Sequence, residues 1–304
     1  MSPRTAPVAS PATPATPASP APTAWWDRAG DPVLAVLVDQ GLASDPRLRR
    51  EAQRVAQAEA RSRQWQWRVV QWVARVLHQA PEAPDALAAR WSDARLRKAA
   101  RIARAYVEVR RLQALLALRQ DFQDHFRDDA DYARWRREAG LVSGVDSGLA
   151  GTLQGLNSDA LGSTRTRLEA AVGALARLDG VARGDLELRL HDGAQMPRIA
   201  GPGPAACART GTGQAARKAA TERDNALGEL ERNAARTVED ARAAYHLGTG
   251  DFATLYVAET AALSAREARI DALARSDLAA IALWTDDGLA GRTAAGAAPR
   301  DCHD

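Results

Sequence analysis

The sequence has little cysteine and no long apolar run, and each shortage excludes a class of protein. The 304 residues include two cysteines, Cys207 and Cys302, whose spacing is not that of metal ligands. No stretch of about 18 apolar residues is present, so we predict no transmembrane helix. The N-terminal residues lack the apolar core of a signal peptide, and none is visible.

The sequence signatures of common enzymes are also missing. The chain has no nucleophile-elbow, Walker or HExxH pattern. Four glycines stand in a Pro/Gly-rich segment that does not follow a strand, so they do not form a phosphate-binding loop: Gly201, Gly203, Gly211 and Gly213. We therefore predict neither an enzyme nor a bound cofactor.

Charge is abundant and mixed. The chain carries 41 basic and 38 acidic residues, for a net charge of +3. Interspersed charges of this kind are typical of the solvated faces of long helices. No basic block with interleaved aromatic residues occurs, so we do not expect nucleic-acid binding.

One acidic cluster is the strongest candidate for a metal site. Asp121 and His125 are four residues apart and would share a helix face. The other members follow closely: Asp124, Asp128, Asp129 and Asp131. A metal would need these groups to converge. A solvated acidic face is the preferred interpretation, balanced by neighbouring arginines at Arg127, Arg134, Arg136 and Arg137, and we predict no metal.

Two short stretches organise the rest of the chain. In each, an apolar residue precedes a glycine, and a helix-capping residue follows three positions after that glycine. The first stretch is Ala139, Gly140, Leu141 and Ser143, and the second is Leu247, Gly248, Thr249 and Asp251. Glycine tolerates the left-handed backbone that ends a helix, and Ser or Asp accepts hydrogen bonds from the first amides of the next one. Each stretch therefore predicts the tight turn of a helical hairpin.

Long helical patterns run into and out of both turns. Apolar residues at helical spacing predict one helix of about 50 residues from Asp85 to Ala139 and a return helix after it, although glycines weaken the return. A first helix begins at Asp31-Pro32 and is interrupted at Asp45-Pro46. The predicted fold is all-α, with two long antiparallel hairpins. Its predicted parts are a disordered segment 1–24, a first helical repeat 25–180 with its tip near 139–146, a linker 181–213, a second hairpin 214–290 with its tip near 247–251, and a disordered tail 291–304.

Residues 64–73 fit two patterns. Trp65, Trp67 and Val69 alternate as in a half-buried strand, whereas Trp65, Val69, Trp72 and Val73 continue as a helical stripe. No second alternating run follows to pair with a strand, so the helix is favoured.

Several segments together resemble a known family. Residues 25–32 (WWDRAGDP), followed by Leu34, Leu37-Val38 and Asp45-Pro46, look like the start of mature TolC/OprM-like outer membrane efflux proteins. Residues 103–110 resemble the first long helix of that family, and residues 138–146 resemble its first hairpin tip. Residues 163–168 resemble its returning helix, and residues 247–259 resemble its second tip.

The resemblance implies a function. Members of that family form trimeric outer membrane ducts, with a long α-helical barrel in the periplasm, and their hairpin tips meet a periplasmic adaptor protein joined to an inner-membrane pump. Carried onto this chain, the adaptor-binding tips would be Ala139, Gly140, Leu141, Ser143, Leu247, Gly248 and Thr249. Asp146 and Asp251 would lie near the closed aperture.

The sequence departs from the family pattern in one respect. The family has two pairs of β-barrel strands, and neither residues 61–90 nor residues 201–214 provide room or pattern for such a pair. We predict that the chain acts as an outer membrane factor of a tripartite efflux system. The resemblance places it at the outer membrane and periplasm and allows a homotrimer. The alternative is a non-transporting helical remnant or interaction scaffold.

Overall fold

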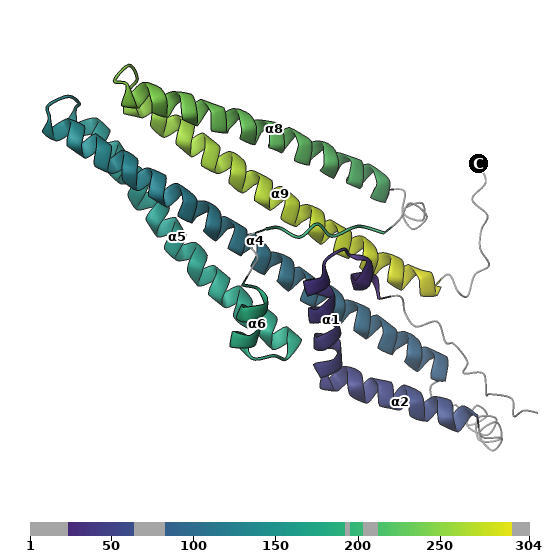
Figure 1. Cartoon of the computed structure of the whole chain (residues 1–304). Coiled ribbons are helices and arrows are strands. Elements are labelled where there is room, and N and C mark those ends of the chain that lie inside the picture. The colour runs from purple at the N-terminus through teal and green to yellow at the C-terminus, as the bar shows by residue number, and fades with distance from the viewer. Residues whose placement is uncertain (1–23, 64–82, 192–194, 203–211, 294–304) are drawn as a thin grey trace, which may run out of the picture.

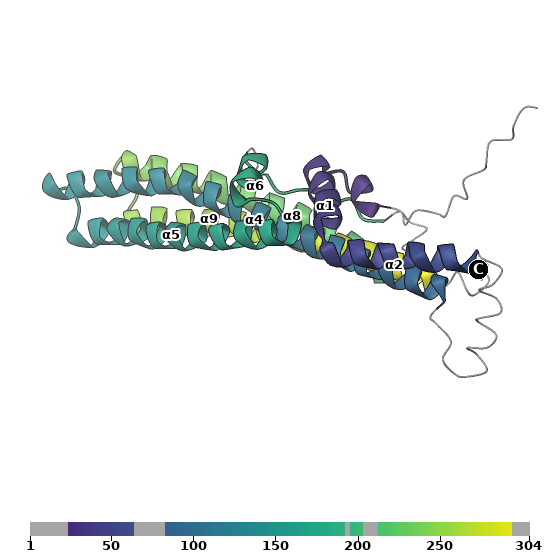
Figure 2. The ribbon, with the colours of Figure 1, turned by 90° about the horizontal axis from the view of Figure 1, so that it is seen from below.

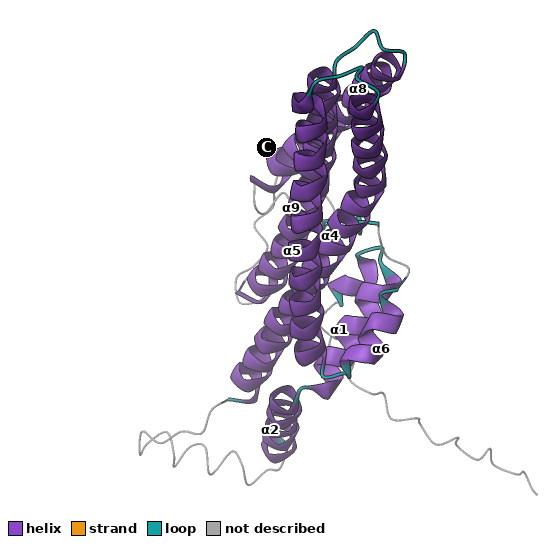
Figure 3. Ribbon diagram, turned by 90° about the vertical axis from the view of Figure 1, so that its left-hand side faces the viewer, coloured by secondary structure: helices purple, strands orange, loops and turns teal. Residues whose placement is uncertain are grey.

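A computed structural model describes residues 24–63, 83–191, 195–202 and 212–293, and every regular element in these ranges is a helix (Figure 3). The predicted all-α fold is therefore confirmed for the described residues. The elements in chain order are the 3-10 helix η1 (Trp25–Arg28) and the α-helices α1 (Pro32–Ser44), α2 (Pro46–Ser62), α4 (Pro84–Glu138), α5 (Gly144–Asp179), α6 (Arg183–Arg189), α8 (Thr212–His246) and α9 (Phe252–Thr293).

Two antiparallel hairpins form the body of the molecule. Helix α4 pairs with α5, α8 pairs with α9, and α9 also lies along α4, so the hairpins run side by side (Figures 1 and 2). The 55 residues of α4 correspond to a length of about 80 Å at 1.5 Å per residue. Both hairpin turns lie at the same end of this elongated bundle (Figure 1).

The predicted helix starts near the N-terminus are confirmed in detail. The carboxylate of Asp31 accepts hydrogen bonds from the amides of Val33 and Leu34, at 2.9 and 3.1 Å. Asp45 does the same for the amides of Arg47 and Leu48, at 2.8 and 3.3 Å. A proline follows each aspartate at the first helical position, where its missing N–H removes no helical hydrogen bond.

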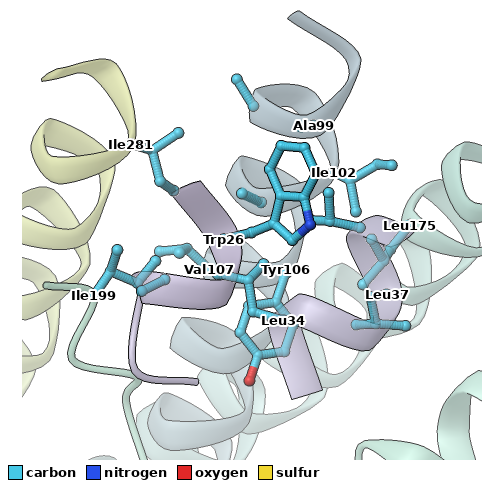
Figure 4. Close-up of a cluster of buried hydrophobic side chains, with 14 of the residues drawn as sticks. Trp26, Leu34, Leu37, Ala99, Ile102, Tyr106, Val107, Leu175, Ile199 and Ile281 are labelled. Carbon is cyan, nitrogen blue, oxygen red and sulfur yellow. The ribbon is translucent and has the colours of Figure 1, made fainter. Parts of the chain in front are cut away.

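The N-terminal tryptophans anchor these short helices to the bundle. Trp26 is buried, and its indole N–H donates to Asp39 at 2.8 Å. Figure 4 shows its ring among residues from distant segments, which include Ile102, Tyr106 and Ile281. The Tyr106 hydroxyl in turn donates to Asp31 at 2.7 Å, which joins the cap of α1 to the middle of α4.

A second apolar core lies near the turns. Its largest buried members come from α4, α5, α8 and α9: Phe122, Phe126, Leu153, Tyr245, Phe252 and Leu255. All four long helices therefore share one core at the end of the bundle that carries the turns.

The segment predicted as a linker contains structure that the sequence did not indicate. Helix α6 lies within it, on the same side of the bundle as α1 (Figure 2). Residues 195–202 form an extended strap: the amide of Ile199 donates to Asp277 at 2.8 Å, and the indole of Trp284 donates to the carbonyl of Ala200 at 2.7 Å. The amide of Ala200 also donates to the carbonyl of Ala29 at 3.1 Å, so the strap joins α9 to the residue that follows η1. The helix predicted at 64–73 falls outside the described residues, and the division of the chain into domains stays a prediction.

Glycines in the helices have two different roles. A Cβ at Gly41 would overlap Ile102 Cδ1 and would lie 3.3 Å from the backbone Cα of Asp179, so the missing side chain lets α1 pack closely against α4 and α5. A Cβ at Gly148, Gly151, Gly155 or Gly162 of α5 would meet nothing within 4 Å. Packing among the described residues therefore requires none of these four glycines.

We expect Gly41→Ala to lower the free energy of unfolding by about 1–3 kcal/mol, because the added methyl group overpacks a filled site. The matched control, Gly151→Ala, should raise it by up to about 1 kcal/mol, because alanine favours an exposed helix. Denaturant unfolding followed by circular dichroism measures both. Equal effects of the two substitutions would contradict the packing described for Gly41.

Candidate functional site

The first turn has the geometry that its sequence predicts. Gly140 adopts a φ of 71°, in the left-handed region. The amides of Gly140 and Leu141 donate to the carbonyls of Arg137 and Arg136, each at 2.9 Å, and so close the end of α4. The hydroxyl of Ser143 then accepts the amide of Val145 at 3.2 Å and begins α5.

The second turn repeats this arrangement. Gly248 adopts a φ of 76°, and its amide donates to the carbonyl of Tyr245 at 3.1 Å. The amide of Thr249 donates to the carbonyl of Ala244 at 3.0 Å. Asp251 accepts the amide of Thr254 at 2.7 Å and begins α9. The two turns are thus structurally equivalent.

Side chains of α4 hold the two turns together. The guanidinium of Arg136 donates to the carbonyl of Tyr245 at 2.9 Å and lies 4.9 Å from the centre of the Tyr245 ring. The hydroxyl of Tyr132 donates to the carbonyl of His246 at 3.2 Å. The last carbonyls of a helix lack partners within that helix and carry partial negative charge. The first hairpin therefore caps the end of α8.

All seven residues predicted to bind an adaptor are exposed, and they lie at this one end of the molecule. Leu141 is 68% exposed and Leu247 is 79% exposed. Trp135, one turn before the first tip, is 66% exposed, and the sequence analysis did not single it out. The sequence signal for this residue is a tryptophan one helical turn before the glycine that is predicted to end the helix. Trp135, Leu141 and Leu247 thus face solvent around two turns that are closed by backbone hydrogen bonds.

The two aspartates predicted near an aperture differ in their surroundings. Asp146 is half-buried in the first turn of α5. Asp251 is exposed, and hydrogen bonds from Thr254 hold the pKa of its carboxyl below the usual range. Asp251 therefore has a clear structural role as a helix cap, and the aperture role of both residues stays a prediction.

Most of the acidic cluster on α4 pairs with arginines. Asp124 and Asp131 pair with Arg127 and Arg134 on the same helix, and Asp121 reaches Arg266 of α9 at 3.5 Å. Among the described residues, no group of His, Cys, Asp or Glu is arranged to hold a metal ion.

Asp129 departs from the predicted solvated face, because its side chain is buried. It shares Arg242 of α8 with Glu259 of α9, which is fully buried. His246 Nε2 lies 3.9 Å from the other oxygen of Asp129. Burial, together with the hydrogen bond and negative charge of Asp129, raises the pKa of Glu259 to about 8. Glu259 therefore keeps its proton to a higher pH than an exposed glutamate does.

Comparison with known proteins finds likeness only at the level of structure. No protein-family model and no curated protein matches the sequence. The outer-membrane channel OprN is 15% identical, with a TM-score of 0.68, over 87% of this chain and 92% of that one. The outer membrane protein VceC from Vibrio cholerae is 14% identical, with a TM-score of 0.65, over 87% of this chain and 98% of that one.

A third structure, CusC, which is described as forming a transmembrane channel, is 12% identical, with a TM-score of 0.66, over 86% of this chain and 92% of that one. The chain has the helical fold of TolC-type outer membrane channels. At these identities the likeness is one of fold. None of the described helices combines the length and apolarity needed to cross a membrane.

We expect Arg136→Met to loosen the link between the two turns, because it removes a charged hydrogen bond and a cation–π contact. The free energy of unfolding should fall by about 1–2 kcal/mol, and the amides at 247–250 should exchange hydrogen faster. The neighbouring control is Arg137→Met, since the exposed Arg137 side chain donates a 3.3 Å hydrogen bond to Ser147 within its own hairpin and, among the described residues, none to the second turn. If the two variants behave alike in hydrogen exchange, Arg136 does not join the turns.

We also expect a pH dependence from Glu259. Its folded-state pKa of about 8 lies above the ordinary value of 4.5. The contribution of Glu259 to the free energy of unfolding is therefore fully present below about pH 4.5 and is lost as the pH rises through 8. Glu259→Gln should reduce the slope of unfolding free energy against pH in this window, by at most about 1.4 kcal/mol per pH unit.

The control for Glu259→Gln is Glu138→Gln, at the exposed end of α4. Burial also raises the pKa values of Asp277 and Asp179, to about 7 and about 6, and these two residues keep their own contributions in both variants. Unfolding in denaturant at a series of pH values gives the slopes. A Glu259→Gln slope as steep as that of the unmodified protein would contradict this assignment.

Proposed function

We propose that this chain is the helical part of an outer membrane efflux channel, and that its two hairpin tips dock on a periplasmic adaptor protein. The observation that carries the proposal is the pair of equivalent turns at one end, each presenting an exposed leucine, Leu141 and Leu247. The likeness in fold to three outer membrane proteins supports the channel assignment. The adaptor would connect the tips to an inner-membrane pump, and the complex would export small molecules.

The form of the tips fits such docking. Internal hydrogen bonds hold each turn, so little conformational freedom is lost when a partner binds. Apolar side chains that protrude from rigid backbone are typical of residues that dominate binding energy, and tryptophan is common among them. We therefore add Trp135 to the seven tip residues predicted from the sequence.

Assembly with further copies is part of the same proposal. Among the described elements of one chain, α8 packs mainly against α9 and α5 mainly against α4, so each outer helix keeps a side that none of the other described long helices covers. A homotrimer placed between the outer membrane and the periplasm would cover these sides. Light scattering on the purified chain measures the oligomeric state, and a strictly monomeric protein at high concentration would favour the alternative of a non-transporting scaffold.

Site-specific photo-crosslinking in the native host tests the docking surface. A photoreactive residue at position 141 or 247 should crosslink to one and the same adaptor protein, identified by mass spectrometry. The control is position 188, since Leu188 of α6 is equally exposed and lies away from the tips. Equal yields at all three positions, or crosslinks at the tips only to further copies of this chain, would contradict adaptor docking.

Charge substitutions give the energetic test with the identified adaptor. Leu141→Asp and Leu247→Asp should each weaken binding by about tenfold or more, because a carboxylate would replace a buried apolar contact. Leu188→Asp should leave the affinity unchanged. Isothermal calorimetry or surface plasmon resonance on the purified proteins measures these changes.

A further inference from the structure

The end of the bundle opposite the tips carries a concentration of positive charge. Helix α2 lies beside the start of α4 at that end (Figure 1). Its 17 residues contain five arginines against two glutamates, although the whole chain has a net charge of only +3. Helix α2 therefore has a net charge of +3, five arginines minus two glutamates.

Three of these arginines form a stripe. Arg47, Arg50 and Arg54 are spaced three and four residues apart, so they lie on one face of α2, over about 10 Å of its length. All three side chains are exposed. Within the part of the chain that the structure describes, no carboxylate lies at ion-pair distance from any of them. These charges are therefore available to a partner.

A groove of about 740 Å³ runs between α2 and α4 next to this stripe. Arg54 lines it from α2, and Arg97 lines it from α4. Its apolar lining comes from Val55, Leu87 and Trp91. The groove thus combines cations with an apolar surface, which are the two features that an anionic lipid requires.

The acidic residues in the groove do not cancel the stripe. Glu51 and Asp93 also line it, and Asp93 lies 3.7 Å from Arg97. Arg47 and Arg50 lie outside the groove lining, and neither has an ion-pair partner among the residues that the structure describes. The excess of positive charge therefore lies along the edge of the groove, where phosphate groups would approach.

We propose that this edge of α2 and α4 binds the headgroups of anionic phospholipids at a membrane surface. A basic amphipathic helix is the form that such binding takes, and each arginine near an anionic surface adds to the attraction. A nucleic acid fits less well, because α2 itself has no aromatic side chain on which a base could stack, and Trp91 is half-buried in the groove. The surface is far from the tips, so this binding does not depend on adaptor docking.

Vesicle co-sedimentation of the full chain tests the proposal. We expect binding to vesicles of phosphatidylglycerol mixed with phosphatidylcholine, and little binding to phosphatidylcholine alone. The binding should weaken as salt is added, because salt screens exposed charges. The triple variant Arg47→Gln, Arg50→Gln, Arg54→Gln should lose about tenfold or more of its partitioning.

A matched variant distinguishes the effect of losing these three arginines from the effect of lowering the net charge of the chain. Arg127→Gln, Arg134→Gln, Arg183→Gln removes the same number of charges from exposed positions that already have acidic partners. It should bind vesicles as the unmodified protein does, and circular dichroism confirms that both variants remain helical. An equal loss in both variants would overturn the proposal, as would equal binding to neutral vesicles. Tighter binding to a DNA duplex than to anionic vesicles would also overturn it.

Discussion

Helix α9 lies antiparallel along α4, and both apolar cores of the molecule are built on that contact. One core includes Ile102 of α4 with Ile281 of α9, and the other includes Phe126 of α4 with Phe252 of α9. Burial of apolar surface at two separated places holds the hairpins together, because neither hairpin alone can cover the apolar side of its long helices.

Between the two cores, ion pairs form the contact between α4 and α9, which we call the seam. Arg111 pairs with Asp271 at 2.8 Å, and Arg119 pairs with Glu267. Nearer the tips, Asp129 of α4 and Glu259 of α9 both contact the guanidinium of Arg242. Apolar contacts alone tolerate sliding of one helix past another, whereas a shift by one helical turn would break each of these pairs. The seam therefore derives its register from charge, and the partly exposed pairs add little stability of their own.

Local signals in the sequence predict the helix boundaries well. Asp-Pro at positions 31 and 45 and glycine at positions 140 and 248 act on neighbouring amides and carbonyls, so their effect needs no knowledge of the fold. Sequence reasoning missed α6 and the strap at 195–202, because the strap has no periodicity and is held by groups such as Asp277, 78 residues from Ile199. The sequence neighbours of Asp129 predict a solvated helix face. Its burial instead reflects packing against the segment of α9 that carries Glu259, which is far away in the chain.

The two exposed leucines at the tips carry a cost in free energy, because their apolar surface faces water. Leu141 and Leu247 stand on turns whose backbone amides are satisfied and whose positions are tied by Arg136 and Tyr132. Flexible loops can turn apolar side chains inward, but these turns are too short and too well hydrogen-bonded to do so. The same bonds that end each helix keep each leucine in water, at a cost of about 25 cal/mol for each Å² of apolar surface left exposed. A partner that covers both leucines recovers this free energy without reorganising the turns, which is why rigid turns and exposed leucines together support a docking role.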